Sequence, residues 1–176
     1  MTDNDKTASR VADYPLPQEG WSELDDRVVV RISGPGTDKF LQGQFSQNLT
    51  EVTATRSPRA AAATPKGRAY CLTRMVRDGE DILMDHPADL ADDAITHLRK
   101  YLMLFRGTTM EIVPDLRIVG ILGNAVAENL AADALESLRE SGDSVRLNDG
   151  FLIASEPTAE GIPRFEFWQT SEGGTA

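Results

Sequence analysis

A glycine–proline–glycine break at residues 34–36 separates two amphipathic stretches and constrains the fold more than any other short segment. Residues 27–33, before the break, carry valine or isoleucine at every second position from Val28 on, which predicts a strand. Residues 37–45, after it, begin with an aspartate near the positive end of a helix dipole and continue with two large apolar side chains, which predicts a short helix. We expect Gly43 to end this helix, because glycine enters the left-handed conformation without steric cost.

Two turn signals further along indicate antiparallel strands. The turn at 65–67 separates expected strands over residues 59–64 and 68–76. Asp78-Gly79 is a stronger hairpin signal, and it leads into an expected strand over residues 81–84. Hairpins that follow one helix and precede another indicate an α+β fold.

The clearest helical pattern follows these hairpins. Apolar side chains recur at three- and four-residue spacing between Leu90 and Leu102, with acidic residues at the start and basic residues at the end, as the helix dipole favours. We expect Asp85-His86-Pro87 to open this helix, which would make His86 a capping or surface residue. A strand over residues 108–113 is expected to close the first unit.

A second strand–break–helix pattern begins at residue 116. An expected strand over 116–122, a break at Gly123-Asn124 and an expected helix over 125–138 repeat the order of the first unit, and three short strands follow. The expected division is a flexible lead-in over residues 1–22, a first α+β unit over 23–114, a partial second α+β unit over 115–170 and a polar tail over 171–176.

Composition limits the classes of function. The formal net charge of −10 and the pI of about 4.6 argue against broad electrostatic binding of nucleic acid. No apolar run approaches the roughly 20 residues of a membrane span, and the polar start argues against a signal peptide. A single cysteine, Cys71, excludes an internal disulfide and fits a reducing cytoplasm, and two histidines beside it argue against a zinc site.

The chain shows no nucleophile with an adjacent base and orienting group, so no catalytic residue is assigned. Cys71, in an expected strand, is interpreted as a small core residue. Lys66-Gly67-Arg68 is either a solvated hairpin tip or an anchor for a carboxylate or phosphate. The amides of Gln42, Gln44 and Asn48 are either the polar exit of a helix or ligand contacts.

Several of these segments, in this order and spacing, resemble the YgfZ/GcvT-like folate-binding family over about residues 24–123. They are Leu24-Asp25-Asp26, Lys39-Phe40-Leu41-Gln42-Gly43-Gln44 with Asn48, Lys66-Gly67-Arg68, Arg77-Asp78-Gly79 and Leu98-Arg99-Lys100-Tyr101-Leu102. The resemblance implies the fold of the glycine-cleavage aminomethyltransferase: two related strand–helix–strands units, with tetrahydrofolate in an opening between these units and a C-terminal β-barrel. The second unit is expected to be incomplete here and the barrel absent.

The resemblance also implies a function. We expect a cytoplasmic folate-binding protein, truncated relative to the family, with a role in tRNA modification and iron–sulfur protein maintenance, tetrahydrofolate or a derivative as cofactor, and iron–sulfur enzymes as clients. Neither catalytic residues nor metal ligands are assigned, and no membrane partner is expected. The expected cofactor-binding residues are Arg27, Gln42, Gln44, Asn48, Lys66 and Arg68.

The chain departs from the family pattern at three places. Arg27 follows Leu-Asp-Asp where the family carries a folate-contacting tryptophan, and Tyr70-Cys71-Leu72 stands where the aminomethyltransferases carry an aspartate. The family's downstream Lys-Gly-Cys motif is not in this sequence. Two other hypotheses therefore stay open: a non-catalytic interaction module that retains the fold, and an enzyme of the aminomethyltransferase type.

Overall fold

A computed structural model describes residues 17–170 and has the expected α+β class. Its strands are β1 (Gly20–Glu23), β2 (Arg27–Ser33), β3 (Arg59–Ala63), β4 (Ala69–Asp78), β5 (Asp81–Pro87), β6 (Thr109–Ile112), β7 (Arg117–Leu122), β8 (Ser144–Leu147), β9 (Gly150–Ser155) and β10 (Arg164–Gln169). Its helices are α1 (Thr37–Gln44), α2 (Ala88–Leu102) and α3 (Ala125–Ala131), with short 3₁₀ turns η1 (Leu49–Glu51) and η2 (Leu135–Ser137).

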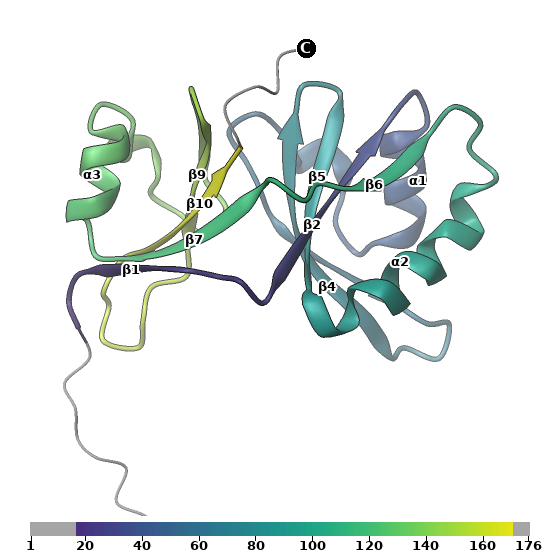
Figure 1. The fold of residues 1–176 in the computed structure, drawn as a ribbon, viewed down its shortest axis with the longest axis horizontal. Helices are drawn as coiled ribbons and strands as arrows, with labels where there is room; N and C mark the ends of the chain where they lie inside the picture. The colour runs from purple at the N-terminus through teal and green to yellow at the C-terminus, as the bar shows by residue number, and fades with distance from the viewer. Residues whose placement is uncertain (1–16, 171–176) are drawn as a thin grey trace, which may run out of the picture.

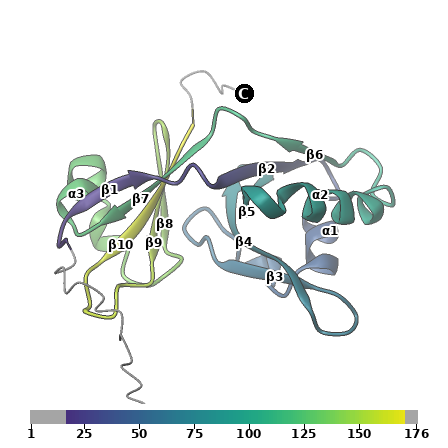
Figure 2. The same ribbon diagram turned by 60° about the horizontal axis from the view of Figure 1, so that its bottom comes forward.

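The strands form two antiparallel five-stranded sheets, which make up the two lobes in Figures 1 and 2. We call them the β2 sheet, with strand order β3-β4-β5-β2-β6, and the β7 sheet, with order β1-β7-β10-β9-β8. The strands of the β2 sheet come from residues 27–112, whereas β1, which precedes them, pairs with β7 in the other sheet. The expected lead-in thus contains a strand from Gly20 on; its residues 1–16, and the expected tail over 171–176, lie outside the described residues.

The β2 sheet has two buried faces, which explains why its central strands are almost continuously apolar. One face packs against α1 and α2, and Val30 and Ile32 of β2 point into that core together with Phe40 and Leu41 of α1. The other face turns Val29 toward the β7 sheet. The alternation noted in the sequence therefore marks the helix-facing side of β2.

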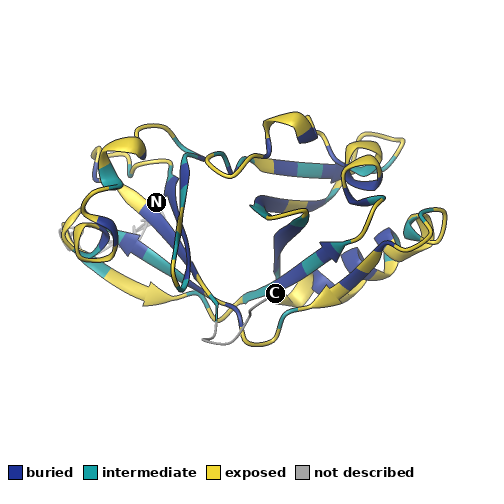
Figure 3. Cartoon of the chain, turned by 90° about the horizontal axis from the view of Figure 1, so that it is seen from above, coloured by how far each residue is buried: buried dark blue, intermediate teal, exposed yellow. Residues whose placement is uncertain are grey.

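A second apolar cluster joins the two sheets. Val76 and Leu83 of the β2 sheet pack there with Phe151, Ile153 and Trp168 of the β7 sheet. The third cluster lies between the β7 sheet and α3, so the layers run helices, sheet, sheet, helix. Figure 3 shows the burial that results, with dark blue strands inside and yellow loops and outer helix turns.

Two local expectations are wrong. Asp85 and His86 do not open α2; they belong to β5, whose ladder extends to the pairing of Arg27 with Pro87. Pro87 is at once the last residue of β5 and the N-cap of α2. Gly43 does not end α1 in the left-handed conformation: it has a negative φ inside the helix, which continues to Gln44.

The expected helix over 125–138 is also shorter than predicted. It ends at Ala131 and is followed by the turn η2, and its buried face is formed by Ala127 and Ala131. The large apolar side chain of Leu130 is exposed.

Candidate functional site

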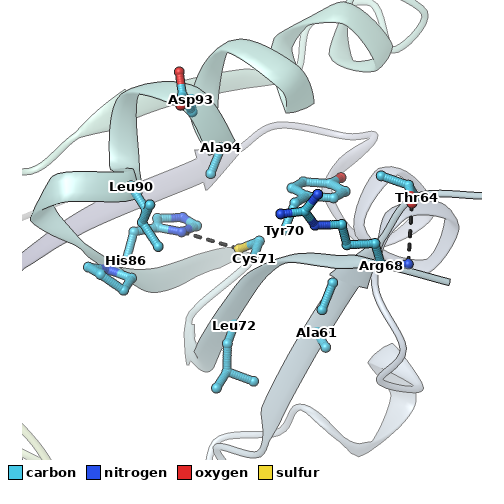
Figure 4. A pocket seen from close by; sticks show the side chains of 12 residues that line it. Ala61, Thr64, Arg68, Tyr70, Cys71, Leu72, His86, Leu90, Asp93 and Ala94 are labelled. Atoms are coloured by element: carbon cyan, nitrogen blue, oxygen red, sulfur yellow. Dashed lines mark hydrogen bonds between the residues drawn. The ribbon is translucent and has the colours of Figure 1, made fainter. Parts of the chain in front are cut away.

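A cavity of about 720 Å³ opens between the first half of α2 and the β3–β4 hairpin (Figure 4). Its wall is mainly apolar, and Leu90, which the helical pattern predicted to be in the core, lines it and is half exposed. Its size is within the roughly 300–1,000 Å³ of small-molecule sites. The lining residues are Ala61, Thr64, Arg68, Ala69, Tyr70, Cys71, Leu72, His86, Pro87, Leu90, Asp93 and Ala94.

One end of the cavity holds a buried thiol–imidazole pair. Cys71 Sγ lies 3.3 Å from His86 Nδ1, because β4 and β5 point both side chains toward α2. Burial, with a smaller effect of the Asp85 charge, raises the pKa of the Cys71 thiol to about 12. Burial, with the nearby Arg27 charge, lowers the pKa of His86 to about 4. Both groups are therefore neutral at pH 7, and the pair does not form a nucleophilic thiolate.

The other end of the cavity holds Arg68 and Tyr70 (Figure 4). The Arg68 guanidinium has no hydrogen-bond or ion-pair partner within residues 17–170; its backbone N–H donates to Thr64 Oγ1. The Tyr70 ring contacts His97 of α2 with 4.5 Å between ring centroids. An apolar cavity with an aromatic ring and an unpaired cation at one end suits a flat ring system that carries a carboxylate.

A second hollow, of about 390 Å³, lies between the two sheets. Arg27 and Arg59 of the β2 sheet line it with Arg164 of the β7 sheet, and the exposed Trp21 of β1 forms part of its rim. Arg27 is ion-paired with Asp85 at 2.9 Å and Arg59 with Glu166 at 2.7 Å. Two of its three cations are thus already neutralised by the protein.

The six expected cofactor-binding residues do not surround one cavity. Arg68 lines the cavity of Figure 4, and Arg27 lines the hollow between the sheets. Lys66 is exposed at the tip of the β3–β4 hairpin. Their roles in binding stay predictions.

Two of the three amide side chains accept hydrogen bonds from backbone N–H groups nearby in the chain. Gln42 Oε1 accepts from the N–H of Leu49 at 2.8 Å, and Asn48 Oδ1 accepts from Thr50 N–H at the start of η1. Gln44 is half-buried, and its amide has no hydrogen-bond partner among the described residues. None of the three lines either cavity described above.

Sequence reasoning missed most of the cavity wall. The sequence pattern places His86 at a helix start, whereas it belongs to β5, and Pro87 is both the end of β5 and the N-cap of α2. The apolar run Ile82-Leu83-Met84 immediately before them was the available signal, since a buried strand with two covered faces carries no alternation.

Within residues 17–170, no group of three or more His, Cys, Asp and Glu side chains is arranged to hold a metal ion. In the same part of the chain, no helix has the length and apolar character needed to cross a membrane.

No family model matches the chain. It is 27% identical over 115 residues to the tRNA-modifying protein YgfZ of Shigella dysenteriae, covering 62% of this chain and 34% of that protein. It is 31% identical over 100 residues to the protein of the same name from Klebsiella pneumoniae, covering 57% and 30%. The matched region thus spans about a third of the length of these relatives.

The fold has a match among solved structures. It superimposes on the glycine cleavage system aminomethyltransferase T of Bartonella henselae with a TM-score of 0.71 and 17% identity, over 87% of this chain and 42% of that one. The resemblance noted in the sequence is confirmed at this level. The chain is a distant homologue of the YgfZ tRNA-modifying proteins over 62% of its length and has the fold of part of the aminomethyltransferase.

Proposed function

We propose that this chain binds a reduced folate, tetrahydrofolate or a derivative, in the cavity between α2 and the β3–β4 hairpin. The wider role we propose is that of a YgfZ-like protein in the cytoplasm, acting in tRNA modification and in the maintenance of iron–sulfur proteins. The distant homology and the shared fold support both statements.

The observation that carries the binding proposal is the position of the cavity. It opens at Tyr70-Cys71-Leu72, the stretch that by the sequence resemblance stands where the aminomethyltransferases carry an aspartate. The Tyr70 ring offers a surface for a pterin or benzoyl ring, and the unpaired Arg68 offers two parallel donors to a glutamate carboxylate.

The chemistry of the cavity favours holding a folate over transferring a one-carbon unit. The stretch Tyr70-Cys71-Leu72, which by the sequence resemblance stands where the aminomethyltransferases carry an aspartate, contains a thiol whose pKa is raised to about 12, and the neighbouring imidazole has a pKa lowered to about 4. Neither group readily exchanges a proton at pH 7, because an efficient general acid or base has a pKa near the working pH. We therefore assign no catalytic residue.

Isothermal titration calorimetry with tetrahydrofolate tests the proposal. Wild type is expected to bind, and Arg68→Ala and Tyr70→Ala are each expected to weaken binding at least fivefold. Lys39→Ala is the matched control, because Lys39 is also an exposed cation without a partner in the described chain but lies on α1 outside the cavity. No heat with wild type, or equal affinity in all four proteins, would contradict folate binding in this cavity.

The cellular role is tested separately. In bacterial cells that lack their own YgfZ protein, expression of this chain is expected to raise the activity of iron–sulfur enzymes and the content of modified nucleosides in tRNA. Arg68→Ala is expected to lose this effect in proportion to its loss of folate affinity. Folate binding in vitro without any change in these cellular measurements would retain the binding proposal and reject the role.

A further inference from the structure

After α2 ends, the chain turns back into β6 (Figure 1). The surface of this turn combines exposed apolar side chains with cations that have no partner in the described part of the chain. Met103 and Leu104 are 82% and 79% exposed, and Ile112 on β6 is 48% exposed. We call this region, residues 99–112, the α2–β6 edge. Adjacent exposed side chains of this size mark an interaction site more often than an isolated exposed leucine does.

The α2–β6 edge also contains a strand edge that no strand within residues 17–170 pairs with. β6 is the last strand of the β2 sheet and pairs on one side with β2. The N–H of Val113 donates to the carbonyl of Val29, so these two residues form a hydrogen-bonded pair. Hydrogen-bonded and non-hydrogen-bonded pairs alternate along an antiparallel ladder. That alternation turns the N–H and C=O groups of Thr109 and Glu111 toward β2. It leaves those of Met110 and Ile112 facing away from the sheet.

Beside this free edge lies a hollow of about 790 Å³ between β6 and the end of α2. Its apolar floor is formed by Leu102, Met103, Phe105 and Met110. A backbone that pairs with β6 would place alternate side chains toward this floor, because side chains in a strand alternate between its two faces.

Charge indicates which kind of chain fits. Arg99, Lys100 and Arg106 flank the hollow or its loop, and within residues 17–170 none of their side chains has a hydrogen-bond or ion-pair partner. Three cations within eight positions of sequence stand out in a protein with a formal net charge of −10. The helix dipole accounts for Arg99 and Lys100 at the end of α2, but it does not account for Arg106 in the loop.

We propose that the α2–β6 edge binds an extended, acidic segment of a partner protein. The segment adds a strand to β6, places alternate apolar side chains in the hollow and directs its carboxylates toward Arg99, Lys100 and Arg106. A free strand edge favours a peptide over RNA or a membrane surface, because another backbone satisfies outward N–H and C=O groups in register. This proposal does not depend on the binding of folate in the cavity between α2 and the β3–β4 hairpin.

The test is selection of peptides from a random displayed library on the purified full chain. Enriched peptides are expected to carry apolar residues at every second position, with Asp or Glu on the same face or at the ends of that pattern, where they can reach the cations beside the hollow. The most enriched peptide is then measured by fluorescence polarisation. Arg99→Glu and Arg106→Glu are each expected to weaken its binding at least fivefold. Lys39→Glu, the same charge change at an exposed position on α1, is expected to leave binding unchanged.

Two further measurements test strand addition itself. Ile112→Pro removes an outward N–H while leaving the hydrogen bonds to β2 in place, and it is expected to weaken binding at least tenfold. The second measurement changes the peptide instead of the protein. Two peptides are N-methylated at alternate amides, one at the odd and one at the even positions, and the same loss of binding is expected for one of the two.

Three results would overturn the proposal. They are selected peptides without acidic enrichment, peptide binding that is insensitive to N-methylation in both registers, and an empty selection. In the last case, charge-dependent binding of phosphatidylserine vesicles or of RNA to the same surface would assign it to that class of partner instead.

Discussion

Arg74 and Glu166 form a buried, two-pronged ion pair that joins the two sheets. Arg74 Nε lies 3.0 Å from Glu166 Oε2 and Arg74 Nη2 lies 3.1 Å from Oε1, although 92 residues separate the two in the chain. Their side chains are 1% and 11% exposed. Burial opposes ionisation of Glu166, but the charge and hydrogen bonds of Arg74, with the charge of Arg59, outweigh it and lower the pKa of that carboxyl.

Removing one partner of this buried pair is expected to destabilise the protein far more than removing one partner of an exposed pair. Arg74→Ala leaves Glu166 buried without its main counter-ion and frees the carbonyl of Ser57, so we expect the free energy of unfolding to fall by about 3–5 kcal/mol. Urea unfolding followed by circular dichroism measures this. The control is Arg117→Ala, whose pair with Glu23 is exposed and is expected to contribute less than about 1 kcal/mol. Similar losses in the two variants would show that the buried pair does not stabilise the sheet packing.

This pair also shows where sequence reasoning stops. Local patterns predicted every strand of both sheets except β1, because turn residues and apolar runs are signals within a few positions of one another. Arg74 and Glu166 carry no such signal. Their pairing follows from the packing of one sheet on the other, which brings β4 and β10 together.

The candidate site was predictable only in part for the same reason. Arg68 was singled out as part of a compact basic turn, and the structure places it in a cavity. The cavity itself depends on where β5 ends and α2 begins, and Pro87 fits a helix start and a strand end equally well by sequence. The structure makes Pro87 both: its long-range pairing with Arg27 ends β5, and as N-cap it precedes α2.

Stability is expected to fall as the pH drops from 6.5 toward 4.5 because of His86. Its pKa is lowered from 6.5 to about 4 by burial and the Arg27 charge, so in this window the unfolded chain takes up a proton that the folded chain does not. The stabilisation is therefore fully present above pH 6.5 and is lost as the pH falls, by up to about 3 kcal/mol at the lower end of the titration. Urea unfolding at half-unit pH intervals measures the loss.

The control for this pH dependence is His86→Gln, which is expected to have a flatter profile between pH 6.5 and 4.5 whatever its absolute stability. Glu166, whose lowered pKa also makes stability fall with acid, acts mainly below its ordinary value of 4.5. Burial raises the pKa of Asp85, which has the opposite effect on stability, so the difference between wild type and variant isolates the contribution of His86. A wild-type profile as flat as that of the variant would contradict a buried neutral His86.

The Cys71 thiol is expected to be inert in the folded protein. Burial and the charge of Asp85 raise its pKa to about 12, so at pH 8 roughly one thiol in ten thousand is ionised, and the thiolate is the reactive form. Ellman's reagent is expected to modify Cys71 over hours in the native protein and within seconds in 6 M guanidinium, where one thiol per chain should be counted. Stoichiometric reaction of the native protein within the mixing time would show that His86 activates the thiol.

Two glycines near the first turn are expected to respond to alanine in opposite directions. Gly34 has a φ of +107°, and a Cβ there would lie 2.1 Å from the carbonyl oxygen of Gly107, so Gly34→Ala is expected to lower the free energy of unfolding by at least about 1 kcal/mol. Gly43 lies inside α1 with no atom within 4 Å of an added Cβ. Gly43→Ala is therefore expected to stabilise the protein by about 0.5–1 kcal/mol, because alanine loses less backbone freedom in a helix. Thermal and urea unfolding of both variants measure the changes, and a destabilised Gly43→Ala protein would indicate that α1 does end at Gly43, as its sequence alone suggests.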